Sequence, residues 1–273
     1  MEWFEAIILG LLQGFTEFLP VSSSGHLVIG RELLGVEASD DLVFEVTVHA
    51  ATVLSTIFVF RKQIWNLLSG FFRFRYNDQT DYILKIGVSM IPIFIVGMFF
   101  KDYVEGLFGS LTGVAFALLV TAVLLVFSDV AYYAFKDKSI YKSVSGKEYR
   151  NGLSYWQAFV VGLGQAFAVA PGLSRSGTTI ATGLICGVRR DVMAQFSFLM
   201  VLVPILGEAF LSLAGGEMSS SSVGWLPLIL GVVSAFLAGL LARNVMIALV
   251  KKARLSWFAL YCVVVAVLIF IFQ

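Results

Sequence analysis

The sequence predicts an all-α integral membrane protein, a polytopic helical bundle with an inverted-topology repeat. In this fold two re-entrant helical hairpins accompany six transmembrane helices. Apolar residues make up 59% of the 273-residue chain and charged residues only 14%, whereas soluble domains carry about 25% charged residues. Six long apolar segments and two short, interrupted ones define the elements. The net charge of +1 gives no reason to expect a nucleic-acid partner, and we expect membrane lipids around the chain.

Six segments are long enough to cross a bilayer, since a spanning helix needs about 20 mostly apolar residues. They are residues 43–61, 81–100, 111–135, 191–214, 223–242 and 255–272. Residues 63–75, after the first span, form an amphipathic pattern, which predicts a helix lying on the inner membrane surface. Asp129 and Asp191 fall near the cytoplasmic interface, where we expect solvated carboxylates.

Two further apolar regions, residues 4–36 and 154–188, are each interrupted by a polar turn. The turns run from Pro20 to Gly25 and from Pro171 to Gly177. The flanking arms of 11–17 residues are roughly 16–25 Å long, which is short for a crossing. Irregular backbone is tolerated at membrane depth only where it is buried in protein or lines a wet cavity. Each region is therefore predicted to be a re-entrant hairpin.

An offset of 152 residues aligns the two hairpins without a gap. The matched pairs are Gly10 with Gly162, Gln13 with Gln165, Ser22 with Ser174, Ser24 with Ser176 and Gly25 with Gly177. This self-similarity predicts an internal repeat: unit 1 in residues 1–135, a cytoplasmic loop in 136–153 and unit 2 in 154–273, together forming one membrane domain. Each unit holds one hairpin and three spans, and the odd number inverts the second unit.

Basic residues alternate between the connecting loops. They gather in residues 61–80, 136–150 and 243–254, whereas 101–110 and 215–222 are poor in them. Basic loops mark the cytoplasmic side, so both termini are predicted to be outside. The first hairpin then enters from outside and the second from inside. The two polar turns should meet near the midplane, with the site opening on the outer face.

The first turn places three chemically active groups close together. Gln13 and Glu17 are four residues apart and share a helix face. Ser23 and His26 follow, so a hydroxyl, an imidazole and a carboxylate lie within one short run. A serine nucleophile needs a base within hydrogen-bond reach, and His26 lies one helical turn after Ser23. The alternative is that the serines cap the second arm and His26 fills the core.

The second turn offers a site for an anion. Ser174, Arg175 and Ser176 stand at a predicted helix start, where free N–H groups and the helix dipole favour negative charge. The Arg175 guanidinium matches phosphate oxygens. The alternative is a snorkelling arginine, but Arg175 lies at the far end of its hairpin. Together the turns indicate phosphate-ester or pyrophosphate chemistry, or an anion-binding transporter or flippase. A structural subunit would not need Arg175.

Two long motifs carry a family resemblance. The run from Gln13 to His26 and the run from Pro171 to Thr179 resemble the signatures of bacterial undecaprenyl-pyrophosphate phosphatases of the bacitracin-resistance (BacA) type. The likeness extends over essentially the whole chain. It implies a multi-pass enzyme of the bacterial plasma membrane that removes the terminal phosphate of a polyprenyl pyrophosphate lipid. This reaction recycles the lipid carrier for cell-wall synthesis and gives bacitracin resistance.

The resemblance also implies a divalent cation, Mg²⁺ or Ca²⁺, and roles for individual residues. Ser23 would be the nucleophile, His26 the acid/base group and Arg175 a phosphate-binding catalytic group. Glu17 and Gln13 would hold the metal or activate the nucleophile; the family motif has Glu or Gln at the position of Gln13. The remaining substrate-binding residues would be Ser22, Ser24, Gly25, Ser174, Ser176, Gly177 and Thr178.

The sequence leaves several points open. A covalent phosphoserine and a metal-activated water both fit the motifs. Lipid transport by the same chain is compatible with them too, and the pattern does not decide whether the protein forms a homo-oligomer.

Overall fold

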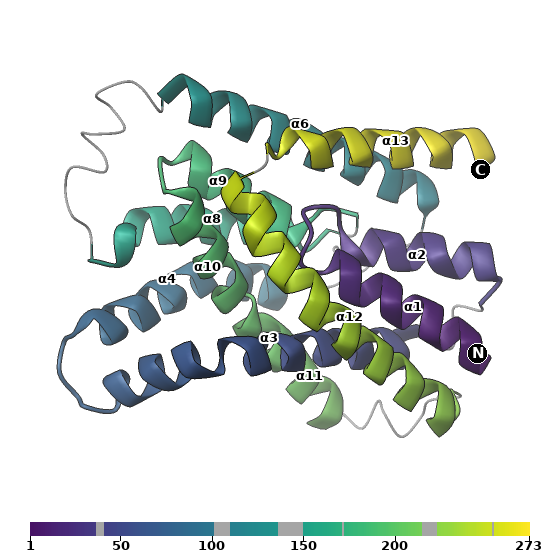
Figure 1. Cartoon of the computed structure of the whole chain (residues 1–273), viewed down its shortest axis with the longest axis horizontal. Helices are drawn as coiled ribbons and strands as arrows, with labels where there is room; N and C mark the ends of the chain where they lie inside the picture. The colour runs from purple at the N-terminus through teal and green to yellow at the C-terminus, as the bar shows by residue number, and fades with distance from the viewer. Residues whose placement is uncertain (37–40, 101–109, 136–149, 171, 215–222, 253) are drawn as a thin grey trace.

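The computed structural model describes residues 1–36, 41–100, 110–135, 150–170, 172–214, 223–252 and 254–273. These residues form a bundle of helices, and no strand occurs among them (Figure 1). The elements are α1 (Trp3–Thr16), α2 (Ser23–Leu34), α3 (Asp41–Phe71), α4 (Asp78–Phe99), α6 (Leu111–Phe135), the 3₁₀ turn η3 (Arg150–Gly152), α8 (Tyr155–Phe167), α9 (Arg175–Ile185), α10 (Arg190–Met200), α11 (Leu202–Ala214), α12 (Trp225–Lys252) and α13 (Ser256–Phe272).

The described residues contain five helical stretches that are long and apolar enough to cross a membrane. They are Val43–Phe71, Asp78–Phe99, Leu111–Ala134, Arg190–Leu211 and Trp225–Ala242. An all-α, multi-pass membrane fold is therefore confirmed. The sixth predicted span forms α13, which has 17 residues and is about 26 Å long. That length is at the short end of the range for a crossing.

The predicted surface helix over residues 63–75 is wrong. α3 continues without a break from Asp41 to Phe71. Its sequence contains no proline and its first glycine is Gly70, so nothing interrupts the helix before that point. The chain then turns, and the side chain of Asn77 caps α4 by accepting a hydrogen bond from the Thr80 N–H at 2.8 Å.

The span predicted over 191–214 is divided into α10 and α11. Val201 separates the two helices. Pro204 explains the break, because a proline ring conflicts with the carbonyl four residues earlier, here that of Met200. The break contributes to the site, since Val201 and Leu202 line the pocket described below.

Repeat-related glycines let the hairpins pack closely on the long helices. α1 packs along α12, α8 packs along α4, and α6 lies beside α13 (Figure 1). A Cβ on Gly10 would overlap the Ser234 hydroxyl of α12, and a Cβ on Gly162 would overlap the Ser89 carbonyl of α4. Small residues at such crossings are typical of helices packed in membranes.

Asp129 is not solvated, so this expectation is wrong. Its side chain is buried and accepts a hydrogen bond from Arg190 at 2.6 Å. The N–H and the hydroxyl of Ser256 donate to its other oxygen at 2.8 and 2.7 Å. One buried carboxylate thus joins α6, α10 and the start of α13. Asp191 is partly exposed, as expected, and pairs with Arg189.

Candidate active site

The first polar turn joins α1 to α2. α1 ends at Thr16, with Glu17 as its C-cap, and Pro20 lacks the N–H that another helical turn would use. α2 begins after Ser22, whose hydroxyl accepts a hydrogen bond from the Gly25 N–H at 3.2 Å. Ser22 has a φ of 68°. A non-glycine residue held in this conformation costs free energy and is typical of functional sites.

The second turn, which leads into α9, has the same cap. Ser174 accepts a hydrogen bond from the Gly177 N–H at 3.1 Å, and its hydroxyl lies 3.4 Å from that of Ser176. In the first turn the hydroxyls of Ser22 and Ser24 are likewise 3.3 Å apart. The first serine of each motif, Ser22 or Ser174, is therefore the helix cap. The next residue, Ser23 or Arg175, is available for another role.

The two turns contact each other, as the sequence predicts (Figure 1). The Ser176 hydroxyl donates to the Leu19 carbonyl at 3.0 Å. A Cβ on Gly25 would lie 3.1 Å from the Cα of Gly172, and one on Gly177 would lie 3.1 Å from the Cβ of Pro20. Both distances are shorter than ordinary van der Waals contacts, so a side chain at either glycine would crowd the opposite turn. Residues from the two halves of the chain thus share one site.

Glu17 is the centre of the polar contacts on the first turn. Its Oε2 accepts a hydrogen bond from Gln13 Nε2 at 2.9 Å and a short one from the Ser23 hydroxyl. His49 of α3 places Nε2 at 3.7 Å from the same oxygen. Both partners are largely buried, with side chains 11% (Glu17) and 12% (His49) exposed. A carboxylate that receives a serine O–H in this way is placed to take its proton.

His26 does not contact Ser23, contrary to the geometry expected from the sequence. Its Nδ1 lies 2.7 Å from the Ser22 carbonyl and its Nε2 lies 2.8 Å from the Tyr261 hydroxyl of α13. The two rings also stack, with centroids 5.6 Å apart. Both ring nitrogens are therefore occupied, and the base beside Ser23 is Glu17.

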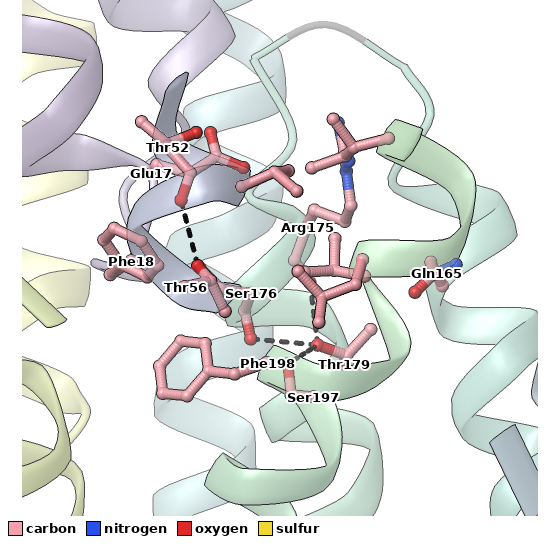
Figure 2. Close-up of a pocket in the computed structure, with 14 residues that line it drawn as sticks. Glu17, Phe18, Thr52, Thr56, Gln165, Arg175, Ser176, Thr179, Ser197 and Phe198 are labelled. Atoms are coloured by element: carbon pink, nitrogen blue, oxygen red, sulfur yellow. Dashed lines mark hydrogen bonds between the residues drawn. The ribbon is translucent and has the colours of Figure 1, made fainter. Parts of the chain in front are cut away.

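Arg175 is the first residue of α9 and lines the same pocket as Glu17 (Figure 2). Within the described part of the chain its guanidinium has no hydrogen-bond partner. A guanidinium left available beside a helix N-terminus suits a phosphate group.

Helices from both units enclose this pocket. Its polar wall includes Thr52 of α3, Gln165 of α8 and a pair of hydroxyls, Thr179 and Ser197, whose oxygens are 2.6 Å apart. The apolar wall comes from Phe18, Phe198, Val201, Leu202 and Ile205. The combination suits a charged headgroup carried on an apolar chain.

Gln13 and Glu17 fit a divalent cation. The Gln13 side chain is fully buried, and its Oε1 has no hydrogen-bond partner among the residues that the structure describes. The Nε2 of the same amide contacts the Glu17 carboxylate at 2.9 Å, and Mg²⁺ and Ca²⁺ prefer oxygen ligands. Over the described ranges no three His, Cys, Asp or Glu side chains cluster as a metal site. These ligands therefore suit a cation that is also bound by substrate phosphates and water.

Thr178 has a different environment from the other predicted substrate-binding residues. Its hydroxyl is buried, without a hydrogen-bond partner in the described part of the chain. It does not line the pocket with Arg175. Ser24 is held against Ser22.

Three residues at or beside the site were missed in the sequence: His49, Gln165 and Tyr261. His49 had a usable signal, because it is one of only two histidines and lies within a predicted span. Gln165 had one too, as the repeat partner of Gln13. Tyr261 had none, since 235 residues separate it from His26.

The fold and the site define a class: a multi-pass helical membrane protein with a pocket lined by an arginine and by a carboxylate that accepts a hydrogen bond from a serine. The model of the family described as "Bacitracin resistance protein BacA" matches residues 6–268. The chain belongs to this family.

Curated relatives match over nearly their full length. The chain is 51% identical to an undecaprenyl-diphosphatase of Bacteroides fragilis, covering 98% of this chain and 97% of the relative. It is 50% identical to an undecaprenyl-diphosphatase of Parabacteroides distasonis, covering 97% and 96%. A protein with the same name from Methanobrevibacter smithii is 35% identical, covering 99% and 97%.

Proposed function

We infer that this chain is an undecaprenyl-diphosphatase, a membrane hydrolase that converts undecaprenyl pyrophosphate to undecaprenyl phosphate and inorganic phosphate. The observation that carries this inference is the hydrogen bond from Ser23 to Glu17, a carboxylate that lines one pocket with Arg175. Relatives with this activity in their names are about half identical over nearly the whole chain. The reaction recycles the lipid carrier for cell-wall polymers and gives bacitracin resistance.

Ser23 and Glu17 supply the attacking group. As the Ser23 oxygen forms its bond to the terminal phosphorus, its proton passes to Glu17. The bond from phosphorus to the bridging oxygen breaks, and its electron pair leaves with undecaprenyl phosphate. Water then releases phosphate from the serine. In the alternative route Ser23 only orients a water molecule that Glu17 deprotonates, and no covalent intermediate forms.

Arg175 and the N-terminus of α9 bind the phosphates. Pyrophosphate cleavage depends mainly on positioning and on neutralising the charge of the transferred group. Arg175 supplies a full positive charge and the helix end a partial one. In a pocket with little water both act more strongly than in bulk solvent.

We propose that Gln13 and Glu17 hold the divalent cation. When bound, Mg²⁺ or Ca²⁺ would neutralise phosphate charge beside the serine. Gln13 also orients Glu17 through its amide N–H. His26 holds the first turn in place between Ser22 and Tyr261; a direct acid/base role would require its ring to leave both partners.

The membrane arrangement is also a proposal. The short pairs α1–α2 and α8–α9 are re-entrant hairpins, with the second unit inverted and both termini outside. Two observations support this. The hairpins lead into the bundle from its two ends in Figure 1, and both chain ends lie at the same end. Cysteines introduced at the two ends should react with an impermeant thiol reagent added outside intact cells, whereas one at position 73 should not.

The activity is tested by phosphate release from undecaprenyl pyrophosphate by the purified protein in detergent. Wild type should release phosphate only with a divalent cation. Arg175→Ala should lower kcat/KM by about a thousandfold, the lower end of the effect of an arginine on phosphoryl transfer. A folded wild type that releases no phosphate would overturn the proposal and favour lipid or anion transport, measured as flux into liposomes.

A further inference from the structure

Gln165 is a buried polar side chain that the proposed reaction does not yet use. It lies near the end of α8 and is fully buried. Neither its Nε2 nor its Oε1 has a hydrogen-bond partner within the described ranges. Buried amides are nearly always hydrogen-bonded, because losing water without a replacement partner is unfavourable. The unpaired amide therefore points to a missing ligand.

The backbone around Gln165 is fixed by close packing. A Cβ on Gly162 would overlap the Ser89 carbonyl of α4, and one on Gly164 would lie 2.5 Å from the Thr182 hydroxyl of α9. α8 is thus wedged between two helices, and the Gln165 backbone has no room to move away. The amide is held at this position by the fold itself.

The internal repeat explains why the amide is free. Its counterpart, Gln13, donates to Glu17 four residues later. At the offset of 152 residues the place of Glu17 is taken by Val169, whose side chain has no hydrogen-bond acceptor. One difference between the repeats therefore frees the Gln165 amide.

Gln165 and Arg175 line the same pocket. Figure 2 shows Glu17 and Gln165 at opposite sides of it, with Arg175 between them. The positive charge of Arg175 disfavours a cation there and favours an anion. An amide beside it presents two N–H donors, which suit phosphate oxygens.

We propose that Gln165 binds the pyrophosphate group of the substrate, with its Nε2 donating a hydrogen bond to a phosphate oxygen. This inference rests on the proposed function. Gln165 then acts with Arg175 in binding, opposite the Ser23–Glu17 pair that carries out the attack.

The test compares Gln165→Leu with Gln157→Leu in the full-length protein in detergent. Gln157 is on the same helix and is also buried, but its amide is satisfied: Oε1 accepts from the Ser154 N–H at 2.8 Å and Nε2 donates to the Cys186 carbonyl at 2.9 Å. It lies outside the pocket. Both variants therefore remove a glutamine amide from α8. The Gln165 amide has no protein partner among the described residues, whereas the Gln157 amide has two.

Gln165→Leu should raise KM by about tenfold or more, as expected for losing one hydrogen bond to a charged group. Its unfolding temperature should stay equal or rise, because no protein hydrogen bond is lost. Gln157→Leu should show the opposite pattern, a lower unfolding temperature and an unchanged KM. An unchanged KM together with a lower unfolding temperature for Gln165→Leu would overturn the proposal.

A calorimetric titration with inorganic pyrophosphate separates this inference from the proposed function, since it does not require turnover. Affinity should fall by about tenfold or more in Gln165→Leu, even if the wild type released no phosphate. Equal affinity in both proteins would overturn the inference. If Gln165→Leu does not fold, Gln165→Asn, which keeps the amide but withdraws it by one methylene, should show the same loss.

Discussion

The hairpins α1–α2 and α8–α9 share one backbone design but carry different chemistry. In both, a serine caps the second helix and accepts a hydrogen bond from a glycine three residues later, Ser22 from Gly25 and Ser174 from Gly177. In both, a glycine in the first helix meets a long helix of the other half of the chain. These shared features determine where the turns lie.

The two repeats differ at the positions of the proposed reactive residues. At the offset of 152 residues, Ser23 corresponds to Arg175, Glu17 to Val169, His26 to Thr178 and His49 to Val201. In the proposed mechanism the first hairpin holds the nucleophile and its base, and the second holds the group that binds phosphate. The repeated scaffold therefore supports one asymmetric site, because the two hairpins share the serine cap but differ in the residues beside it.

The strongest expected effect comes from removing Glu17, the proposed base of the first hairpin. Glu17→Gln keeps the size of the side chain but cannot accept a proton from Ser23. We expect kcat to fall by about 10²–10⁴-fold, the usual contribution of a general base. Steady-state phosphate release measures this. A loss below about tenfold in folded protein would remove Glu17 from the proton transfer.

The shared scaffold is tested next by adding a methyl group at each helix crossing. Gly10→Ala and Gly162→Ala should each lower the stability of the protein by about 1–3 kcal/mol, since the new Cβ overlaps the neighbouring helix. Thermal unfolding in detergent measures the effect. Gly97→Ala is the control, because a Cβ there meets nothing within 4 Å and alanine favours the helix. Unfolding temperatures for Gly10→Ala and Gly162→Ala similar to that of Gly97→Ala would contradict the close packing at the two crossings. A loss at only one of them would contradict their equivalence.

The smallest effect is expected at the contact unique to the first hairpin. Tyr261→Phe removes the hydroxyl that meets His26 Nε2 and keeps the stacked ring. One neutral hydrogen bond contributes about 0.5–1.5 kcal/mol, so kcat/KM should fall by no more than roughly tenfold. A loss of more than a hundredfold would show that the Tyr261–His26 pair takes part in proton transfer rather than in holding the turn.

The sequence was sufficient for features that depend on local pattern. The repeat of the motif around Ser22 at Ser174 predicted the meeting of the two turns. Helix capping by the serines was the alternative interpretation, and the structure shows these caps. The membrane class followed from composition alone.

Prediction from the sequence failed where a residue distant in the chain determines the environment of a side chain. His26 was expected beside Ser23, but Tyr261, far along the chain, binds its Nε2. Asp129 was expected in solvent, but Arg190 and Ser256 bury it. Apolar content also does not mark where a helix ends. α3 continues to Phe71, so the end of that element was misplaced.

A double-mutant cycle tests most directly whether the two turns form a single active site. The kcat/KM for undecaprenyl pyrophosphate is measured for wild type, Glu17→Gln, Arg175→Ala and the double variant. Residues that act as a unit are strongly non-additive, so the double variant should be within about tenfold of the slower single variant. A loss equal to the product of the two single losses would mean that the two hairpins act independently, and would contradict the account.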